Sequence, residues 1–180
     1  IILLAIPVEY IKELLPYIMN RMRIDSVVVD FGSTKYDICK IADKMKNRFQ
    51  YVATHPMAGT EHSGPSNAYA GMFVNKKVII CDKEKSDIKL LKIVEDMLLS
   101  LQMKIIYMGA KEHDVHAAYV SHLSHIISFA LANTVIDKEK ESSNILAMAG
   151  GGFDSTVRLA KSNPLMWLPI LKQNRDNILE

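Results

Sequence analysis

Cysteine and long apolar runs are both scarce in this sequence of 180 residues. Its two cysteines, Cys39 and Cys81, are too few for a disulfide framework and do not form a CxxC pair. We therefore expect reduced, buried thiols in a cytoplasmic protein. No uninterrupted apolar run reaches the roughly 18 to 20 residues that cross a bilayer, so no membrane association is expected.

A charge excess is missing as well. Lys and Arg number 22 against 20 for Asp and Glu, which leaves a net charge of +2. So small an excess provides no general attraction for nucleic acid or for an anionic membrane, and we expect neither as a partner. A small or anionic ligand held by a few placed cations is compatible with this balance.

The chain begins with the apolar run IILLAIPV and has no initiator Met. This run lacks the basic leader and the small-residue cleavage site of a signal peptide. Because the chain starts inside a β-type run, we interpret it as a piece of a longer protein whose upstream part is missing.

Short β-rich runs alternate with helical stretches over the first hundred residues. We predict strands at residues 1–6, 26–31, 50–54, 77–81 and 104–107. Amphipathic helices are predicted at residues 9–22 and 86–101. Since continuous Val/Ile runs suit strands buried on both faces, this alternation predicts an α/β fold with a mostly parallel sheet.

The composition changes near residue 109. Residues 111–136 are rich in Ala, His, Leu and Ile and carry no strand signal. We therefore predict two domains, an α/β domain over residues 1–108 and an all-helical domain over residues 109–180. The second is small for an independent core, so it should pack on the first, on a second copy of the chain, or on both.

Turn and cap signals divide the helical domain. Three glycines at residues 150–152 break the chain, and a short helix is predicted at residues 154–161. Asn163 is a good N-cap and Pro164 suits the first helical position, so a last helix should run from there toward residue 180.

A first polar cluster lies where the predicted strand at residues 26–31 ends, from Asp30 to Lys35. Ligands gather at the carboxyl ends of strands in open α/β sheets, and helix N-termini offer free N–H groups to anions. Ser33 and Thr34 either bind a ligand or cap the next helix, and their spacing leaves both interpretations open.

A second polar cluster, HPMAGTEHSG at residues 55–64, follows the next strand. It is unusually polar for a connection between a strand and a helix. His55, at the end of the strand, could act as a base near neutral pH or could be a bystander in the loop.

A third cluster contains four histidines in the helical segment. On an ideal helix His113 and His116 lie about 60° apart, as do His122 and His125, and the two pairs face opposite sides. The four cannot share one metal ion on a straight helix, and no metal site is expected. We expect one pair to face a cleft and the other a helix interface.

Two further residues follow. Arg158 is either a fork for a carboxylate or an ordinary surface arginine. Trp167 by itself is more typical of a core position than of a ligand contact.

Five segments in combination resemble the prephenate dehydrogenases of tyrosine biosynthesis and their arogenate-using relatives. They are LAIPV at residues 4–8, DFGSTK at 30–35, HPMAGTEHSG at 55–64, HDVHAAYVSHLSH at 113–125 and GGGFDSTVRLAKSNPLMW at 150–167. They occur in the family's order and cover nearly the whole chain, which makes their combination far more specific than any one of them.

The resemblance implies a Rossmann-like nucleotide-binding domain followed by a helical dimerisation domain, a homodimer, and NAD or NADP as cofactor. Family members open with a GxGxxG turn that binds the dinucleotide, and this chain contains none. It starts near the family's fourth strand, so we expect it to bind NAD poorly by itself.

The resemblance also implies roles in an oxidative decarboxylation of prephenate. His55 would take the proton of the ring hydroxyl as hydride departs, and Ser33 would hold the imidazole or the hydroxyl in register. Arg158 would grip a substrate carboxylate. His125 and His122 would line the substrate pocket.

Further positions follow from the same resemblance. Thr60 and Glu61 would form the loop that gates the substrate or sorts its side chain. The nicotinamide side would be lined by Pro7, Asp30, Gly32 and Ser33.

Three positions depart from the family pattern. Val157 separates Thr156 from Arg158, Asp154 replaces a basic or polar residue, and Ser124 replaces a proline. They leave arogenate dehydrogenase as an alternative, since arogenate carries an amino acid side chain where prephenate has a keto acid. A third alternative is a non-catalytic dimerisation or tyrosine-sensing module, and tyrosine is a candidate inhibitor of the enzyme itself.

Overall fold

The computed structural model describes residues 1–60 and 64–180, and the described residues form one five-stranded sheet of order β1-β2-β3-β4-β5. The strands are β1 (Ile2–Leu4), β2 (Val28–Asp30), β3 (Tyr51–Pro56), β4 (Lys77–Cys81) and β5 (Lys104–Met108). β1, β2 and β3 run parallel, β4 pairs antiparallel with β3, and β5 runs parallel to β4. The predicted α/β class with a mostly parallel sheet is confirmed.

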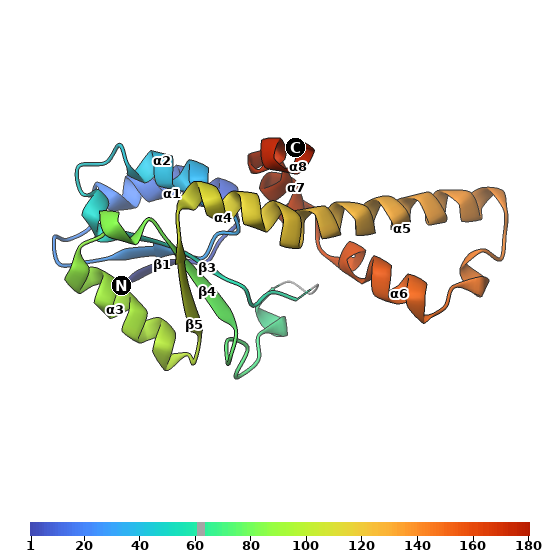
Figure 1. Cartoon of the computed structure of the whole chain (residues 1–180), viewed down its shortest axis with the longest axis horizontal. Coiled ribbons are helices and arrows are strands. Elements are labelled where there is room, and N and C mark those ends of the chain that lie inside the picture. The colour runs from blue at the N-terminus through green and yellow to red at the C-terminus, as the bar shows by residue number, and fades with distance from the viewer. Residues whose placement is uncertain (61–63) are drawn as a thin grey trace.

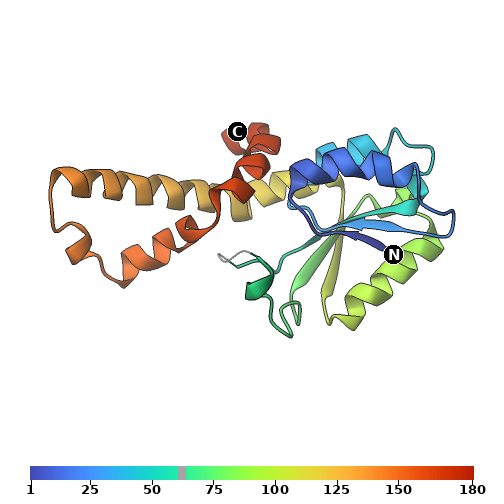
Figure 2. The ribbon, with the colours of Figure 1, turned by 180° about the vertical axis from the view of Figure 1, so that it is seen from behind.

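Helices cover both faces of this sheet, as Figure 1 and the view from behind in Figure 2 show. They are α1 (Val8–Met19), α2 (Tyr36–Ala42) and α3 (Ile88–Ser100). α1 and α2 lie on one face and α3 lies on the other. Since the strands are covered on both sides, their side chains are apolar in unbroken runs rather than in alternation.

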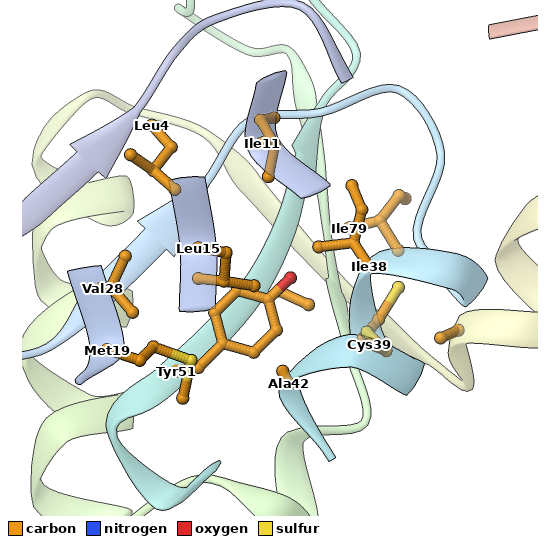
Figure 3. Close-up of a cluster of buried hydrophobic side chains, with 13 residues drawn as sticks. Leu4, Ile11, Leu15, Met19, Val28, Ile38, Cys39, Ala42, Tyr51 and Ile79 are labelled. Atoms are coloured by element: carbon orange, nitrogen blue, oxygen red, sulfur yellow. The ribbon is translucent and has the colours of Figure 1, made fainter. Parts of the chain in front are cut away.

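Alternate residues of each strand enter two separate cores. Val28 packs with α1 and α2, whereas its neighbours Val27 and Val29 pack with α3. Figure 3 shows the first core, in which the ring of Tyr51 lies among aliphatic side chains from α1 and α2. Cys39 and Cys81 are free thiols buried in this same core, and burial raises the pKa of Cys39 to about 12.

The remaining helices form an arm that leaves the sheet and returns. They are α4 (Ala110–Ala117), the π-helical turn η4 (Ala118–His122), α5 (Leu123–Glu141), α6 (Gly151–Val157), α7 (Pro164–Gln173) and α8 (Arg175–Leu179). Short 3-10 turns lie at Arg48–Gln50, Pro65–Asn67, Lys83–Lys85, Leu146–Met148 and Arg158–Lys161. α5 extends away from the sheet, α6 runs back beside it, and α7 and α8 return to the side of α1 and α4 (Figure 1).

The caps explain where the last helices begin and end. Asn163 accepts a hydrogen bond from the Leu165 N–H at 3.0 Å, so the predicted N-cap is confirmed. The single last helix that we predicted is wrong, because it breaks at Asn174 into α7 and α8.

Among the described residues, one helical stretch, Ala110–Glu141, is long and apolar enough to cross a membrane by length and composition alone. Only 28% of its most apolar window is buried. Its first turns, however, pack against the sheet domain and carry the buried polar side chains His113 and Asp114. The exposed apolar part therefore needs another cover.

Candidate active site

A cavity of about 760 Å³ lies between the carboxyl ends of β1, β2 and β3 and the helical arm. Six predicted site residues from distant parts of the chain line it together: Ser33, His55, Thr60, His122, His125 and Arg158. Three others, Pro7, Asp30 and Gly32, are not part of its lining, and Glu61 lies outside the described residues.

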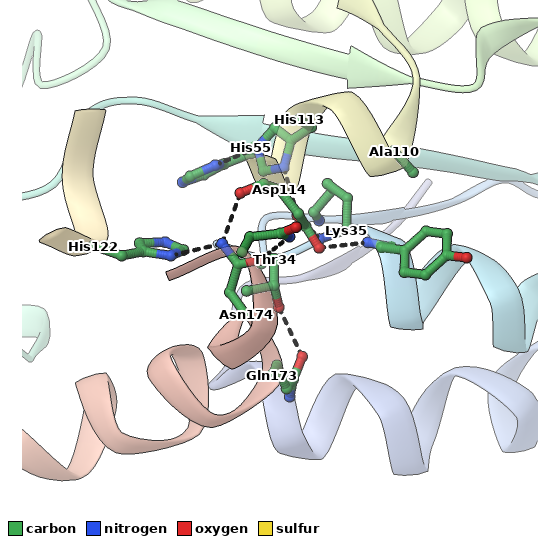
Figure 4. Close-up of polar contacts among 12 residues, drawn as sticks. Thr34, Lys35, His55, Ala110, His113, Asp114, His122, Gln173 and Asn174 are labelled. Carbon is green, nitrogen blue, oxygen red and sulfur yellow. Dashed lines mark hydrogen bonds and ion pairs between the residues drawn. The ribbon is translucent and has the colours of Figure 1, made fainter. Parts of the chain in front are cut away.

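His55 lies near the end of β3 and is hydrogen-bonded to a histidine of the other domain. Its Nδ1 is 2.9 Å from Nε2 of His113 on α4, and the two rings meet edge to face. His113 in turn has its Nδ1 2.8 Å from Oδ1 of Asp114 (Figure 4). The three side chains form a linear series that ends in a carboxylate.

The surroundings of His55 disfavour its charged form. Burial lowers its pKa well below the usual 6.5, and the neighbouring side chains of His113, Lys35 and His122 lower it further. The imidazole is therefore neutral at neutral pH, which is the state that can accept a proton.

Asp114 also holds the start of α2. Its Oδ1 accepts from the backbone N–H of Lys35 at 2.7 Å, and its Oδ2 accepts from that of Tyr36 at 2.9 Å. These N–H groups have no partner inside the helix, so a carboxylate from α4 does the work of an N-cap. The alternative that Ser33 or Thr34 caps this helix is therefore wrong. Thr34 instead donates to the Gln173 Oε1 of α7 at 2.7 Å.

We predicted that Asp30 lies along the cofactor. Its side chain is instead fully buried and does not line the cavity. Its carboxylate accepts from the Gly32 N–H at 2.8 Å and from the Tyr51 hydroxyl at 2.5 Å, and it pairs with the buried ammonium of Lys35. A Cβ on Gly32 would lie 2.9 Å from Asp30 Oδ1, so only glycine allows this close approach. The Asp30 side chain thus supports the turn that presents Ser33 and does not itself face the cavity.

The π-helical turn η4 accounts for the placement of the histidines. A π turn takes in an extra residue, which rotates the side chains after it by about 100° relative to those before it. His113, His122 and His125 are therefore all turned toward the site, whereas His116 is exposed. The predicted pairing of His113 with His116 on one face is wrong for a different reason: both precede the π turn, and the roughly 60° between them is enough to leave His113 buried and His116 exposed.

His122 and His125 have different partners within the cavity wall. His122 Nδ1 is 2.9 Å from the Asn174 side-chain nitrogen, which also donates to the backbone carbonyl of Asp114 at 2.7 Å. His125 stacks on Trp167 with ring centroids 3.5 Å apart, and its Nδ1 lies 2.9 Å from the Ser121 carbonyl. Sequence reasoning missed Asn174, for which the only signal is its place at a helix break.

Arg158 is the cationic side chain that we predicted would hold a carboxylate. It begins the 3-10 turn after α6, is exposed, and lines the cavity. Burial lowers the pKa of His125, and the charge of Arg158, which lines the same cavity, lowers it further. Trp167 is buried, as expected of a core residue, and it also lines the cavity.

No group of three or more His, Cys, Asp and Glu side chains that could hold a metal ion occurs within residues 1–60 and 64–180.

Burial of neutral His122 makes stability depend on pH. Its pKa is lowered from 6.5 to about 4, so between these values the unfolded chain binds a proton that the folded chain excludes. Stability should therefore fall as the pH falls from 6.5 to 4, by about 3 kcal/mol from this group. Urea unfolding of the wild type and of His122→Gln, compared at both ends of this range, should show a smaller acid loss for the variant. Equal losses would contradict the assignment.

An α/β sheet domain with a strand-end cavity, joined to a helical domain, is the architecture of a Rossmann-like nucleotide-binding protein with an added helical domain. The chain belongs to the prephenate dehydrogenase family. The family's nucleotide-binding domain matches residues 1–107, and its dimerization domain matches residues 109–180.

Individual relatives agree with this assignment. Prephenate dehydrogenase of Lactococcus lactis is 33% identical over 183 residues, which are 100% of this chain and 50% of that protein. The Aquifex aeolicus prephenate dehydrogenase, solved with hydroxyphenyl propionate and NAD+, superposes with a TM-score of 0.86 at 33% identity, over 98% of this chain and 62% of that one. Synechocystis arogenate dehydrogenase gives a TM-score of 0.77 at 26% identity, over 98% and 64%. The chain thus spans about half to two thirds of these relatives.

Proposed function

We propose that the protein of which this chain forms part is a prephenate dehydrogenase, which uses NAD or NADP to convert prephenate to 4-hydroxyphenylpyruvate. The observation that carries the proposal is the shared cavity: a neutral imidazole, His55, and a guanidinium, Arg158, line the same space. The reaction needs both, a base for a hydroxyl proton and a cation for a carboxylate.

The chain's own residues supply the proton and binding steps. His55 accepts the proton of the ring hydroxyl, the O–H bond breaks, and the carbon that carried the hydroxyl loses hydride. Loss of CO₂ then makes the ring aromatic. Arg158 holds a carboxylate of the dianion, and Ser33 lies in the same wall to orient the hydroxyl or the imidazole.

The cofactor supplies the hydride acceptor. Ala5 after β1, and Phe31 and Ser33 after β2, line the cavity at the carboxyl ends of parallel strands, where open α/β sheets bind nucleotides. These features fit a nicotinamide ring on the sheet side, with Ser33 beside it.

A homodimer is the cover we propose for the helical arm. The arm exposes large apolar side chains, and a soluble monomer rarely exposes such a continuous surface. They include Tyr119, Val120, Ile127, Ile136, Leu146 and Met148. The match of residues 109–180 to a dimerization domain supports the same partner.

The two buried free thiols support a cytoplasmic location.

Arogenate is the second candidate substrate, and one observation favours it. Asp154 of α6 precedes Arg158 by one helical turn, so its carboxylate is on the same helical face as the guanidinium that lines the cavity. Such a pair complements the ammonium and carboxylate of an amino acid side chain better than a keto acid.

The test follows NADH formation by the gene-length protein, with prephenate and arogenate offered side by side. Turnover of prephenate supports the proposal, and turnover of arogenate alone moves the assignment to the second candidate. A folded dimer that binds these ligands and turns over neither would show a non-catalytic sensing module.

A further inference from the structure

We propose that His113 and Asp114 are positioning residues that fix the tautomer of His55, so that the lone pair of its Nε2 faces the cavity. The inference deepens the proposed function, because only an unprotonated Nε2 can take the proton of a substrate hydroxyl. It rests on geometry that joins three elements: β3 with His55, α4 with His113 and Asp114, and the start of α2.

The direction of the hydrogen bonds follows from the carboxylate. Ionised Asp114 only accepts, so the His113 Nδ1 at 2.8 Å from it must carry the proton. A neutral His113 then has a lone pair on Nε2 and accepts from His55 at 2.9 Å, which requires the His55 Nδ1 to carry its proton. The His55 Nε2 is left without one.

The side chains of His113 and Asp114 are held in one orientation. The side chains of His113 and Asp114 are nearly inaccessible to solvent, at 3% and 5% exposed. Two backbone N–H groups of α2 hold the Asp114 carboxylate, and the Asn174 side chain holds its carbonyl (Figure 4). Rotation of the Asp114 carboxylate would lose its two bonds to the start of α2, so it stays in place as an acceptor for His113.

The same arrangement stabilises the product of proton transfer. When the substrate O–H bond breaks and a bond to Nε2 forms, His55 becomes an imidazolium near the buried ammonium of Lys35, which opposes it. The hydrogen bond from the His55 Nδ1–H to the Nε2 of His113 compensates for this repulsion, because the Asp114 carboxylate polarises His113 from its other side.

His113 offers a graded set of variants. Phe keeps a buried ring but neither accepts nor donates, whereas Gln can accept from His55 with its amide oxygen and donate to Asp114 with its amide nitrogen. His116 lies one turn further along the helical segment and is exposed, so His116→Gln is the matched control.

The first measurement is the nitrogen-15 NMR spectrum of the His55 ring in the gene-length protein without cofactor or substrate, so it does not depend on turnover. We expect a protonated Nδ1 and an unprotonated Nε2 in the wild type and in His116→Gln. In His113→Phe the population should shift toward a protonated Nε2, and in His113→Gln most of the native tautomer should return. A protonated Nε2 in the wild type would overturn the proposal, because His113 would then donate rather than accept.

The second measurement is the rate of the gene-length protein. His113→Phe should lower kcat by about 10- to 100-fold with little change in KM, and His113→Gln should recover part of the loss. Equal kcat values for the wild type and a folded His113→Phe would overturn the positioning role. If the wild type shows the expected tautomer but turns over neither substrate, the proposed function fails and the tautomer assignment stands.

Discussion

Replacing His55 by Asn is expected to lower kcat for prephenate by about 100- to 10,000-fold with a small change in KM. Asn fills a similar volume and can accept a hydrogen bond from the substrate hydroxyl, but it cannot take the proton. Binding should therefore survive while the chemical step fails. Steady-state NADH formation by the gene-length protein measures both constants.

The control for this variant is His116→Asn, which changes an exposed histidine of the helical domain and should leave kcat unchanged. The pH profile provides a second check. Because the pKa of His55 is lowered well below 6.5, the acidic fall of kcat/KM should lie below that pH in the wild type. A near-normal kcat in His55→Asn would contradict the role of His55 as the base.

Replacing Arg158 by Ala is expected to act on binding instead, raising KM for prephenate by about 10- to 100-fold. The guanidinium donates charge-assisted hydrogen bonds to the substrate carboxylate. In Arg158→Ala water takes its place, and the hydrogen bonds of water to the carboxylate are weaker. Arg158→Lys keeps the charge but loses the planar fork, so its KM should lie between those of the wild type and Arg158→Ala.

Thermal unfolding separates this effect from a loss of structure. Arg158 is exposed, and substitutions at exposed positions change stability by about 0.5 kcal/mol or less, so the midpoint should hardly move. An unchanged KM in Arg158→Ala would return Arg158 to the alternative of an ordinary surface arginine.

The α/β class could be predicted from the sequence because strands that are buried on both faces consist of unbroken apolar runs. Runs such as Val27–Val29 are unbroken in apolar character, and each residue enters one of two cores. No comparable residue pattern indicates whether two strands pair parallel or antiparallel. The antiparallel pairing of β4 with β3 is decided by the path of the chain between them, which hydrophobic periodicity does not encode.

Helical geometry limited the prediction of the site. An ideal helix separates His113 from His122 by half a turn, and the π turn at Ala118–His122 reduces that separation by about 100°. Nothing in the residue pattern signals the extra residue. Likewise, Asn174 breaks the last helix at the point where its side chain bonds Asp114 and His122.

The roles of the individual site residues stay predictions, although six of them line one cavity. His55 and Arg158 were each ambiguous by spacing, and the order of five motifs supplied the specificity. The order of the motifs reflects family membership. It therefore indicated which residues form the site, but not which hydrogen bonds join them.

The sequence by itself determined the alternation of strands and helices, the cap at Asn163, the division near residue 109 and the family, because these depend on local pattern and motif order. Only the tertiary structure decided which groups meet. Asp114 contacts Lys35 and Tyr36 from 79 and 78 residues away, and His113 contacts His55 from 58 residues away. Hydrogen bonds between such distant residues depend on how the two domains pack, and that packing settles which nitrogen of His55 faces the cavity.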